Sequence, residues 1–225
     1  MSSNILAADL DPNDVYCKKL ALIDTARRCF ETGLQTNAGG NLSVRLTCAD
    51  ALVIKPSLVG FNECTMDNLM IADFEGQTVA GHGKPSADLD FHAALYAARD
   101  DIKAIVHVHS PWATGWASAG LEIPCLTVQT LGKIGRMPHI PLTENGGPQG
   151  AKEIVPVMQD KSVKVAVLAN HGTIGVGKTL VEAQHLVEII EETAQVAFVR
   201  DGLMLARGMK DATMPSEGLK PVAKG

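Results

Sequence analysis

Two histidines separated by one residue end an apolar run and precede a Ser-Pro pair. The stretch is IVHVHSPWATGWASAG, residues 105–120, and it contains His107 and His109. Residues i and i+2 of a strand point to the same face, with Cα atoms about 6–7 Å apart. Two imidazoles placed in this way can bind one metal ion. They can equally be two edge-strand histidines, and the spacing alone does not decide between these interpretations.

A catalytic zinc site takes three protein ligands and leaves a fourth position open. His171 is the best candidate for the third ligand, because it follows the strand-like run VAVLAN and precedes Gly172 at a turn. The alternative treats His171 as an ordinary loop residue. The histidines together therefore predict a site for Zn²⁺ or another divalent metal, with one position open to substrate.

A carboxylate that could move protons lies upstream. Asp88 and His92 are four residues apart, on one face of a helix that we expect to begin near Ser86. Asp88 is the candidate general acid/base. The alternative is that Ser86 and Asp88 cap and charge the first helical turn, while His92 packs as a core residue.

The segment GTIGVGKT, residues 172–179, also matches the pattern of a phosphate-binding loop, and it follows a strand pattern and precedes a helix pattern. It would make the chain a P-loop nucleotide binder. The β-branched residues inside it, Thr173, Ile174 and Val176, are more typical of a strand.

Composition limits the classes of function. The chain has 225 residues, 46% of them hydrophobic, a formal charge of −5 and a pI near 5.8. Such a charge offers no basic face for nucleic acid or an anionic membrane, so a small-molecule partner is expected. No signal peptide or apolar run of about 18 residues is visible, which predicts a soluble, cytoplasmic protein. The five cysteines are odd in number and never in CxxC, which favours reduced thiols.

Helix and strand patterns alternate along the chain without an interruption that would mark a domain boundary. One helix, 14–33, has Tyr16, Leu20, Ile23 and Phe30 on one face, and the longest helix begins with a capping box of Thr179 and Glu182. Further helices are expected from Ser86, over 111–120 and over 151–160; strands are expected over 41–46, 51–55, 68–73, 77–81, 103–109, 121–128, 163–170 and 173–177.

This order predicts an α/β fold, with three α/β/α layers around a mixed, mostly antiparallel sheet. We expect a single domain over residues 1–225, of which about 207–225 form a loose C-terminal tail.

Several of these segments, taken in order, resemble the class II aldolase/adducin-head family. The likeness rests on NAGGNLSVR, IKPSLVGF, GKPSADLDFHAALY, IVHVHSPWATGWASAG and LANHGTIGVGKTLVEA, and it spans roughly Ala21 to Gly202. It implies the class II aldolase-like fold and a homotetramer. It also implies that His107, His109 and His171 match the zinc ligands and that Asp88 matches the acid/base. The family has a strand where a phosphate-binding loop would have to lie, which disfavours the nucleotide binder.

By the same resemblance, the phosphate of a sugar-phosphate substrate would lie at Asn41, Ser57 and Ser86. The sequence departs from the family pattern at two places, with Leu58 where a glycine is expected and Ala87 where a second serine is expected. The C-terminal tyrosine that some members use is absent, because the chain has only Tyr16 and Tyr96. A hydrogen-bond donor and some backbone room of the family's phosphate site are therefore missing from this sequence.

The resemblance implies a lyase of carbohydrate metabolism. It would be an aldolase that cleaves a ketose 1-phosphate, of the L-fuculose 1-phosphate type, to dihydroxyacetone phosphate and an aldehyde through a metal-bound enediolate. A 4-epimerase or a decarboxylase needs the same metal-bound enediolate, and WASAG and Asp88 are similar to the epimerase. A non-catalytic adducin-like module is a further alternative, against which the three histidines speak.

Overall fold

One sheet organises the computed structural model, which describes residues 5–141 and 146–209. Within these residues eight strands pair in the order β4-β3-β2-β1-β5-β8-β7-β6. Neighbouring strands are antiparallel except β6 and β7, which run parallel. The mixed, mostly antiparallel sheet predicted from the sequence is confirmed. The strands are β1 Asn41–Arg45, β2 Ala51–Ile54, β3 Met70–Asp73, β4 Thr78–Ala80, β5 Ala104–Val108, β6 His139–Ile140, β7 Val165–Leu168 and β8 Gly172–Gly177.

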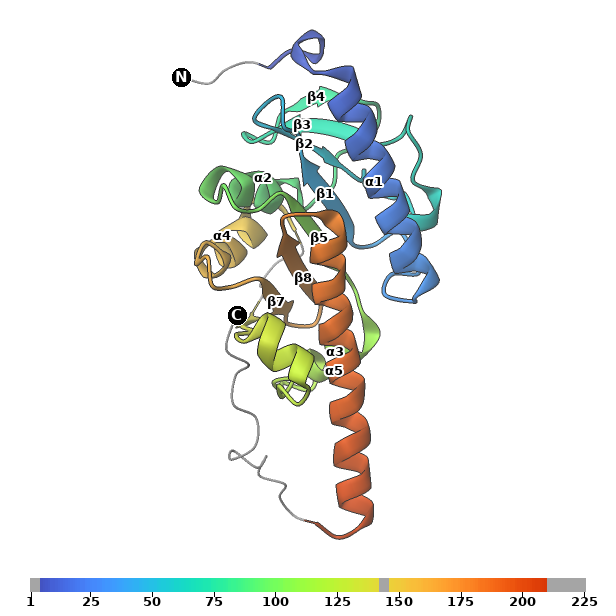
Figure 1. The fold of residues 1–225 in the computed structure, drawn as a ribbon, viewed down its shortest axis with the longest axis vertical. Helices are drawn as coiled ribbons and strands as arrows, with labels where there is room; N and C mark the ends of the chain where they lie inside the picture. The colour runs from blue at the N-terminus through green and yellow to red at the C-terminus, as the bar shows by residue number, and fades with distance from the viewer. Residues whose placement is uncertain (1–4, 142–145, 210–225) are drawn as a thin grey trace.

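Helices cover both faces of the sheet, which gives the expected three layers (Figure 1). One face packs against α1 (Pro12–Glu31), α3 (Pro111–Ser118) and α5 (Leu180–Ala206); the other packs against α2 (Leu89–Ala98) and α4 (Gly147–Met158). Short 3₁₀ turns lie at Ala7–Asp9 and Phe61–Glu63, and a π-helical turn at Thr130–Ile134. No helix in the described ranges is long and apolar enough to cross a membrane.

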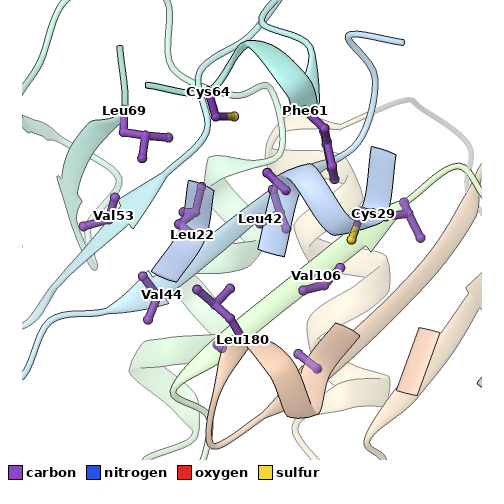
Figure 2. Close-up of a cluster of buried hydrophobic side chains, with 14 of the residues drawn as sticks. Leu22, Cys29, Leu42, Val44, Val53, Phe61, Cys64, Leu69, Val106 and Leu180 are labelled. Carbon is purple, nitrogen blue, oxygen red and sulfur yellow. The ribbon is translucent and has the colours of Figure 1, made fainter. Parts of the chain in front are cut away.

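The period of two along β1 divides its residues between the two faces. Leu42 and Val44 join the cluster under α1 and α5, where Leu22 of α1 and Leu180 of α5 also lie (Figure 2). The alternate residues of β1 therefore face α2. Among them is Ser43, which is fully buried. The polar positions of the NLSVR segment thus point toward the helix that follows Asp88.

Several sequence-based expectations were wrong in detail. Tyr16 and Leu20 of α1 are 57% and 44% exposed, because the buried stripe of this helix is formed by smaller residues such as Ala26 and Cys29. Segment 121–128 contains no strand; Pro124 has no amide N–H for a sheet, and Ile123 packs in the cluster between α3 and α5. The helix expected from Ser86 begins at Leu89.

The capping box expected at the start of α5 forms in half: Thr179 Oγ1 accepts from the Glu182 amide at 3.1 Å, but the Glu182 carboxylate accepts from the Lys178 amide at 2.8 Å instead of from that of Thr179. The phosphate-loop interpretation of residues 172–179 is wrong, since β8 pairs with β5 on one side and β7 on the other. The α4 helix spans 147–158 instead of 151–160. Of the expected C-terminal tail, residues 210–225 lie outside the described residues.

Candidate functional site

Three histidines meet where β5 ends beside the turn from β7 to β8. His107 lies in β5, His109 follows that strand, and His171 lies in the turn. The register of the antiparallel β5 and β8 strands, Val108 opposite Thr173, brings the turn to the end of β5. One ring nitrogen from each histidine can be chosen so that all lie within 4.8 Å of one another. The structure therefore brings together the histidines that the sequence predicted as metal ligands.

Glycines permit this close approach of backbones and rings. A Cβ on Gly172 would lie 2.2 Å from the carbonyl oxygen of Val108, so a side chain there would separate the turn from β5. A Cβ on Gly39 would lie 2.8 Å from the ring of His109. The segment before β1 and the turn before β8 thus both need glycine to hold the histidines together.

The hydrogen bonds of His107 leave a nitrogen free for a ligand. Its Nδ1–H donates to the carbonyl oxygen of Thr173 at 3.0 Å, so Nε2 carries the lone pair. His107 Nε2 and His171 Nδ1 are buried nitrogens without a hydrogen-bond partner among the described residues. Buried polar atoms are ordinarily satisfied. These orphaned nitrogens, in a set of three imidazoles, fit a divalent metal.

Burial keeps these histidines in the neutral form that binds metal. Desolvation is the main cause that lowers the pKa of His107 well below its ordinary value, and the neighbouring His171 and His109 lower it further. Desolvation and then His171 lower the pKa of His109 to about 4. The pKa of His171 is lowered by burial as well. Because a protonated imidazole cannot coordinate, the cluster is ready for a cation at neutral pH.

Asp88 stands immediately before the first residue of α2 and faces the cluster. Its Oδ2 lies 3.8 Å from His107 Nε2 and accepts a hydrogen bond from Asn41 Nδ2 at 2.6 Å. Its other oxygen, Oδ1, has no hydrogen-bond partner within the described ranges. The carboxylate is therefore held by one oxygen at the histidines and has the other available.

The residues expected at the phosphate lie on segments that meet. Ser57 Oγ–H donates to the carbonyl oxygen of Pro85 at 2.9 Å, and Ser86 Oγ accepts from the Asp88 amide at 3.2 Å. Asn41 contacts Asp88 directly, as described above. Leu58, where the family pattern has glycine, has a φ of 62° and is 85% exposed. The backbone here thus has the left-handed conformation that glycine adopts most easily.

Sequence reasoning missed two residues that hold this region. Lys55 is buried, and its Nζ donates to the carbonyl oxygens of Ala38, Pro56 and Val59. Gln35 Oε1 accepts from the His109 amide at 2.7 Å. A buried lysine within an apolar strand pattern was a signal for the first, but nothing local marks Gln35, whose contact is long-range.

Three histidines that could hold a metal ion, with a carboxylate beside them, lie at one end of strand β5 in a mixed, mostly antiparallel sheet covered by helices on both faces. Residues 20–198 match the Class II Aldolase and Adducin N-terminal domain, so the chain belongs to this family.

Individual relatives have different activities. The chain is 30% identical to a 3-oxo-tetronate 4-phosphate decarboxylase of Haemophilus influenzae, over 82% of this chain and 89% of the relative. It is 31% identical to the L-ribulose-5-phosphate 4-epimerase UlaF of Salmonella paratyphi B, over 81% and 82%. The solved structure of an L-fuculose 1-phosphate aldolase superposes with a TM-score of 0.76, at 27% identity over 94% of each chain.

Proposed function

We propose that the protein is a divalent-metal-dependent sugar-phosphate lyase, and specifically an aldolase that cleaves a ketose 1-phosphate of the L-fuculose 1-phosphate type to dihydroxyacetone phosphate and an aldehyde. The observation that carries the proposal is the orphaned nitrogens of His107 and His171, which lie beside His109 and within reach of Asp88. A non-catalytic module gains nothing from unpaired buried imidazoles, which cost free energy unless a ligand satisfies them.

In this proposal His107, His109 and His171 hold the metal, with Zn²⁺ as the first choice for nitrogen ligands. A divalent cation held there supplies a Lewis acid that stabilises the negative charge developing on substrate oxygens as a C–C bond breaks. The Thr173 carbonyl keeps the proton of His107 on Nδ1. Asp88, through Oδ1, which has no hydrogen-bond partner among the described residues, carries the proton that the substrate gains or loses.

We place the substrate phosphate near Asn41, Ser57 and Ser86, whose segments converge beside Asp88. The O–H of Ser86, whose Oγ accepts from the Asp88 amide, and the second N–H of Asn41 Nδ2 are donors that this region offers, whereas the O–H of Ser57 is used by the Pro85 carbonyl. Ala87 contributes no hydroxyl, and Leu58 places a side chain where glycine would leave the backbone open.

A decarboxylase of the same family is the second candidate, and these two positions favour it. Ala87 stands where the family pattern has a serine, and Leu58 stands where it has a glycine. Both changes alter the region where a phosphate at carbon 1 of a ketose would bind. The relative that is a 3-oxo-tetronate 4-phosphate decarboxylase covers 82% of this chain. Loss of CO₂ from a carbon next to a carbonyl needs the same stabilisation of negative charge as C–C cleavage of a ketose. A 4-epimerase shares this requirement.

A direct assay separates these activities. The purified protein, loaded with Zn²⁺ or Mn²⁺, is incubated separately with L-fuculose 1-phosphate, L-ribulose 5-phosphate and a 3-oxo-tetronate 4-phosphate. We expect metal-dependent formation of dihydroxyacetone phosphate from the first, at a rate that chelation with EDTA abolishes. Release of CO₂ would instead assign a decarboxylase, and formation of an epimer would assign a 4-epimerase. Absence of any product would contradict the proposed lyase activity.

We also propose a homotetramer. The C-terminal half of α5 extends beyond the sheet (Figure 1), and apolar side chains along it are exposed. Phe198, Val199 and Leu203 are 60%, 57% and 59% exposed. Exposed apolar surface of this kind is typical of subunit contacts. Light scattering is expected to give about four times the chain mass of 23.8 kDa. A double variant, Phe198→Asp with Leu203→Asp, should have a lower mass in solution. A monomeric wild type would refute the proposal.

A further inference from the structure

A continuous series of hydrogen bonds runs through the layer between β1 and α2 and ends at Asp88. The Tyr96 hydroxyl lies 2.9 Å from Ser43 Oγ, which lies 2.6 Å from His92 Nδ1. His92 Nε2 lies 2.5 Å from Asn41 Oδ1, and Asn41 Nδ2 lies 2.6 Å from Asp88 Oδ2. The series thus links side chains from a strand and a helix that lie about fifty positions apart in the sequence.

The donor in each of these contacts follows from the chemistry of the groups. A carboxylate and an amide oxygen can only accept, so Asn41 donates to Asp88 and His92 Nε2–H donates to Asn41. His92 is neutral, because burial lowers its pKa to about 3, and its Nδ1 therefore accepts from Ser43. Ser43 has then used its proton, so Tyr96 O–H donates to Ser43. All donors point toward Asp88.

These polar groups lie in an apolar layer, where burying them costs free energy that apolar side chains would not. Ser43, His92 and Tyr96 are fully buried, and Asn41 is 3% exposed. Around them the layer is apolar, with Ile54, Leu95, Ile105 and other residues of the cluster between the sheet and α2. Apolar residues of similar shape could fill the same space without any hydrogen bond to satisfy. A series of hydrogen-bonded polar groups is an exception to the usual apolar packing of a core. Such exceptions are expected at functional sites, and this series ends at a candidate catalytic carboxylate.

We propose that His92 is a positioning residue for Asp88: through Asn41 it fixes the carboxylate with Oδ2 at the histidine cluster. Ser43 and Tyr96 fix the ring of His92 in turn. The inference rests on the proposed acid/base role of Asp88. It also explains why the amide of Asn41, expected at a substrate phosphate, lies between Asp88 and His92.

Loss of positioning should affect the chemical step more than substrate binding. A carboxylate displaced by about 1 Å transfers protons poorly, while groups that bind the rest of the substrate are unchanged. We therefore expect His92→Leu to lower kcat about 10- to 100-fold, with a much smaller change in KM and with the metal content unchanged. His92→Gln should restore part of kcat, because a glutamine amide supplies both a donor and an acceptor.

The test combines these kinetics with NMR of the metal-free protein. In the wild type, ring ¹⁵N signals should show a protonated Nε2 and an unprotonated Nδ1 for His92. The side-chain carboxyl ¹³C signal of Asp88 should move in His92→Leu and return toward its wild-type position in His92→Gln. Tyr96→Phe keeps the buried ring and removes only the first donor, so it serves if His92→Leu does not fold, and it should move the ¹⁵N signals of His92.

Contrary results are well defined. A proton on Nδ1 of His92, an unmoved Asp88 signal in His92→Leu, or a glutamine variant no better than the leucine variant would overturn the inference. The NMR readouts need neither metal nor substrate. If the wild type forms no product in the assay proposed above, the proposed function fails by itself, and the ¹⁵N and ¹³C signals still decide for or against the series of hydrogen bonds.

Discussion

Replacing His107 by alanine is expected to abolish binding of a divalent metal and, with it, turnover. His107 is fully buried and its Nε2 is one of the nitrogens left without a partner. The two remaining imidazoles should bind the metal much more weakly, because each coordinating nitrogen contributes to the affinity of the site for the ion. Metal analysis of the purified variant should find less than about a tenth of the wild-type content, and product formation should fall to background.

Matched variants separate loss of a ligand from loss of fold. His171→Ala lies in a turn and leaves a smaller buried gap, so it should lose metal equally, while in EDTA it should unfold near the urea concentration of the metal-free wild type. His82→Ala removes an exposed histidine outside the cluster and should keep both metal and activity. Full metal content in folded His107→Ala and His171→Ala would contradict the three-histidine site, and activity without metal would contradict the proposed mechanism.

The spacing of His107 and His109 was enough to predict that both could bind one ion, because strand periodicity is local. The third histidine of the cluster does not follow from strand periodicity. His171 joins them through the pairing of β5 with β8, and no local pattern specifies which turn lies beside which strand end. The position of His171 at the end of a strand pattern, before Gly172, made it only a candidate; the linked motifs of a family supported it, and the geometry of the cluster agrees with it.

The environment of Asp88 could not be predicted in the same way. Local sequence offered helix capping and a core position for His92 as alternatives. In the structure Asp88 precedes α2 and makes no capping hydrogen bond with its side chain, because Asn41 of β1 holds it. Since β1 lies about fifty residues earlier in the chain, this contact depends on tertiary packing. The same limit explains α1, where Tyr16 and Leu20 of the expected apolar face are exposed while Ile23 and Phe30 of that face pack against the core cluster.

The electrostatics of the site follow from burial more than from charge. His107 and His109 are neutral because desolvation disfavours their protonated forms, and Asp88, which faces His107, is not one of the proposed metal ligands. Removal of the Asp88 charge is therefore expected to change the chemistry available to a substrate without removing a proposed metal ligand. This separation allows the proton carrier to be tested independently of metal binding.

Asp88→Asn is expected to lower kcat by about 10²- to 10⁴-fold, the range typical of a lost general acid/base, while metal content stays at the wild-type level. Asparagine preserves the shape of the side chain but cannot accept a proton at neutral pH. The measurement is steady-state turnover of whichever substrate the direct assay identifies, alongside metal analysis of the same preparation.

Asp90→Asn provides the matched control. Asp90 lies in the first turn of α2, two residues after Asp88, and carries the same charge near the same helix end. A general effect of charge at the N-terminus of α2 would lower the activity of both variants similarly. A specific proton carrier predicts a large loss for Asp88→Asn and near wild-type turnover for Asp90→Asn. Undiminished activity in Asp88→Asn with full metal content would assign proton transfer to another group and would remove the reason to position this carboxylate.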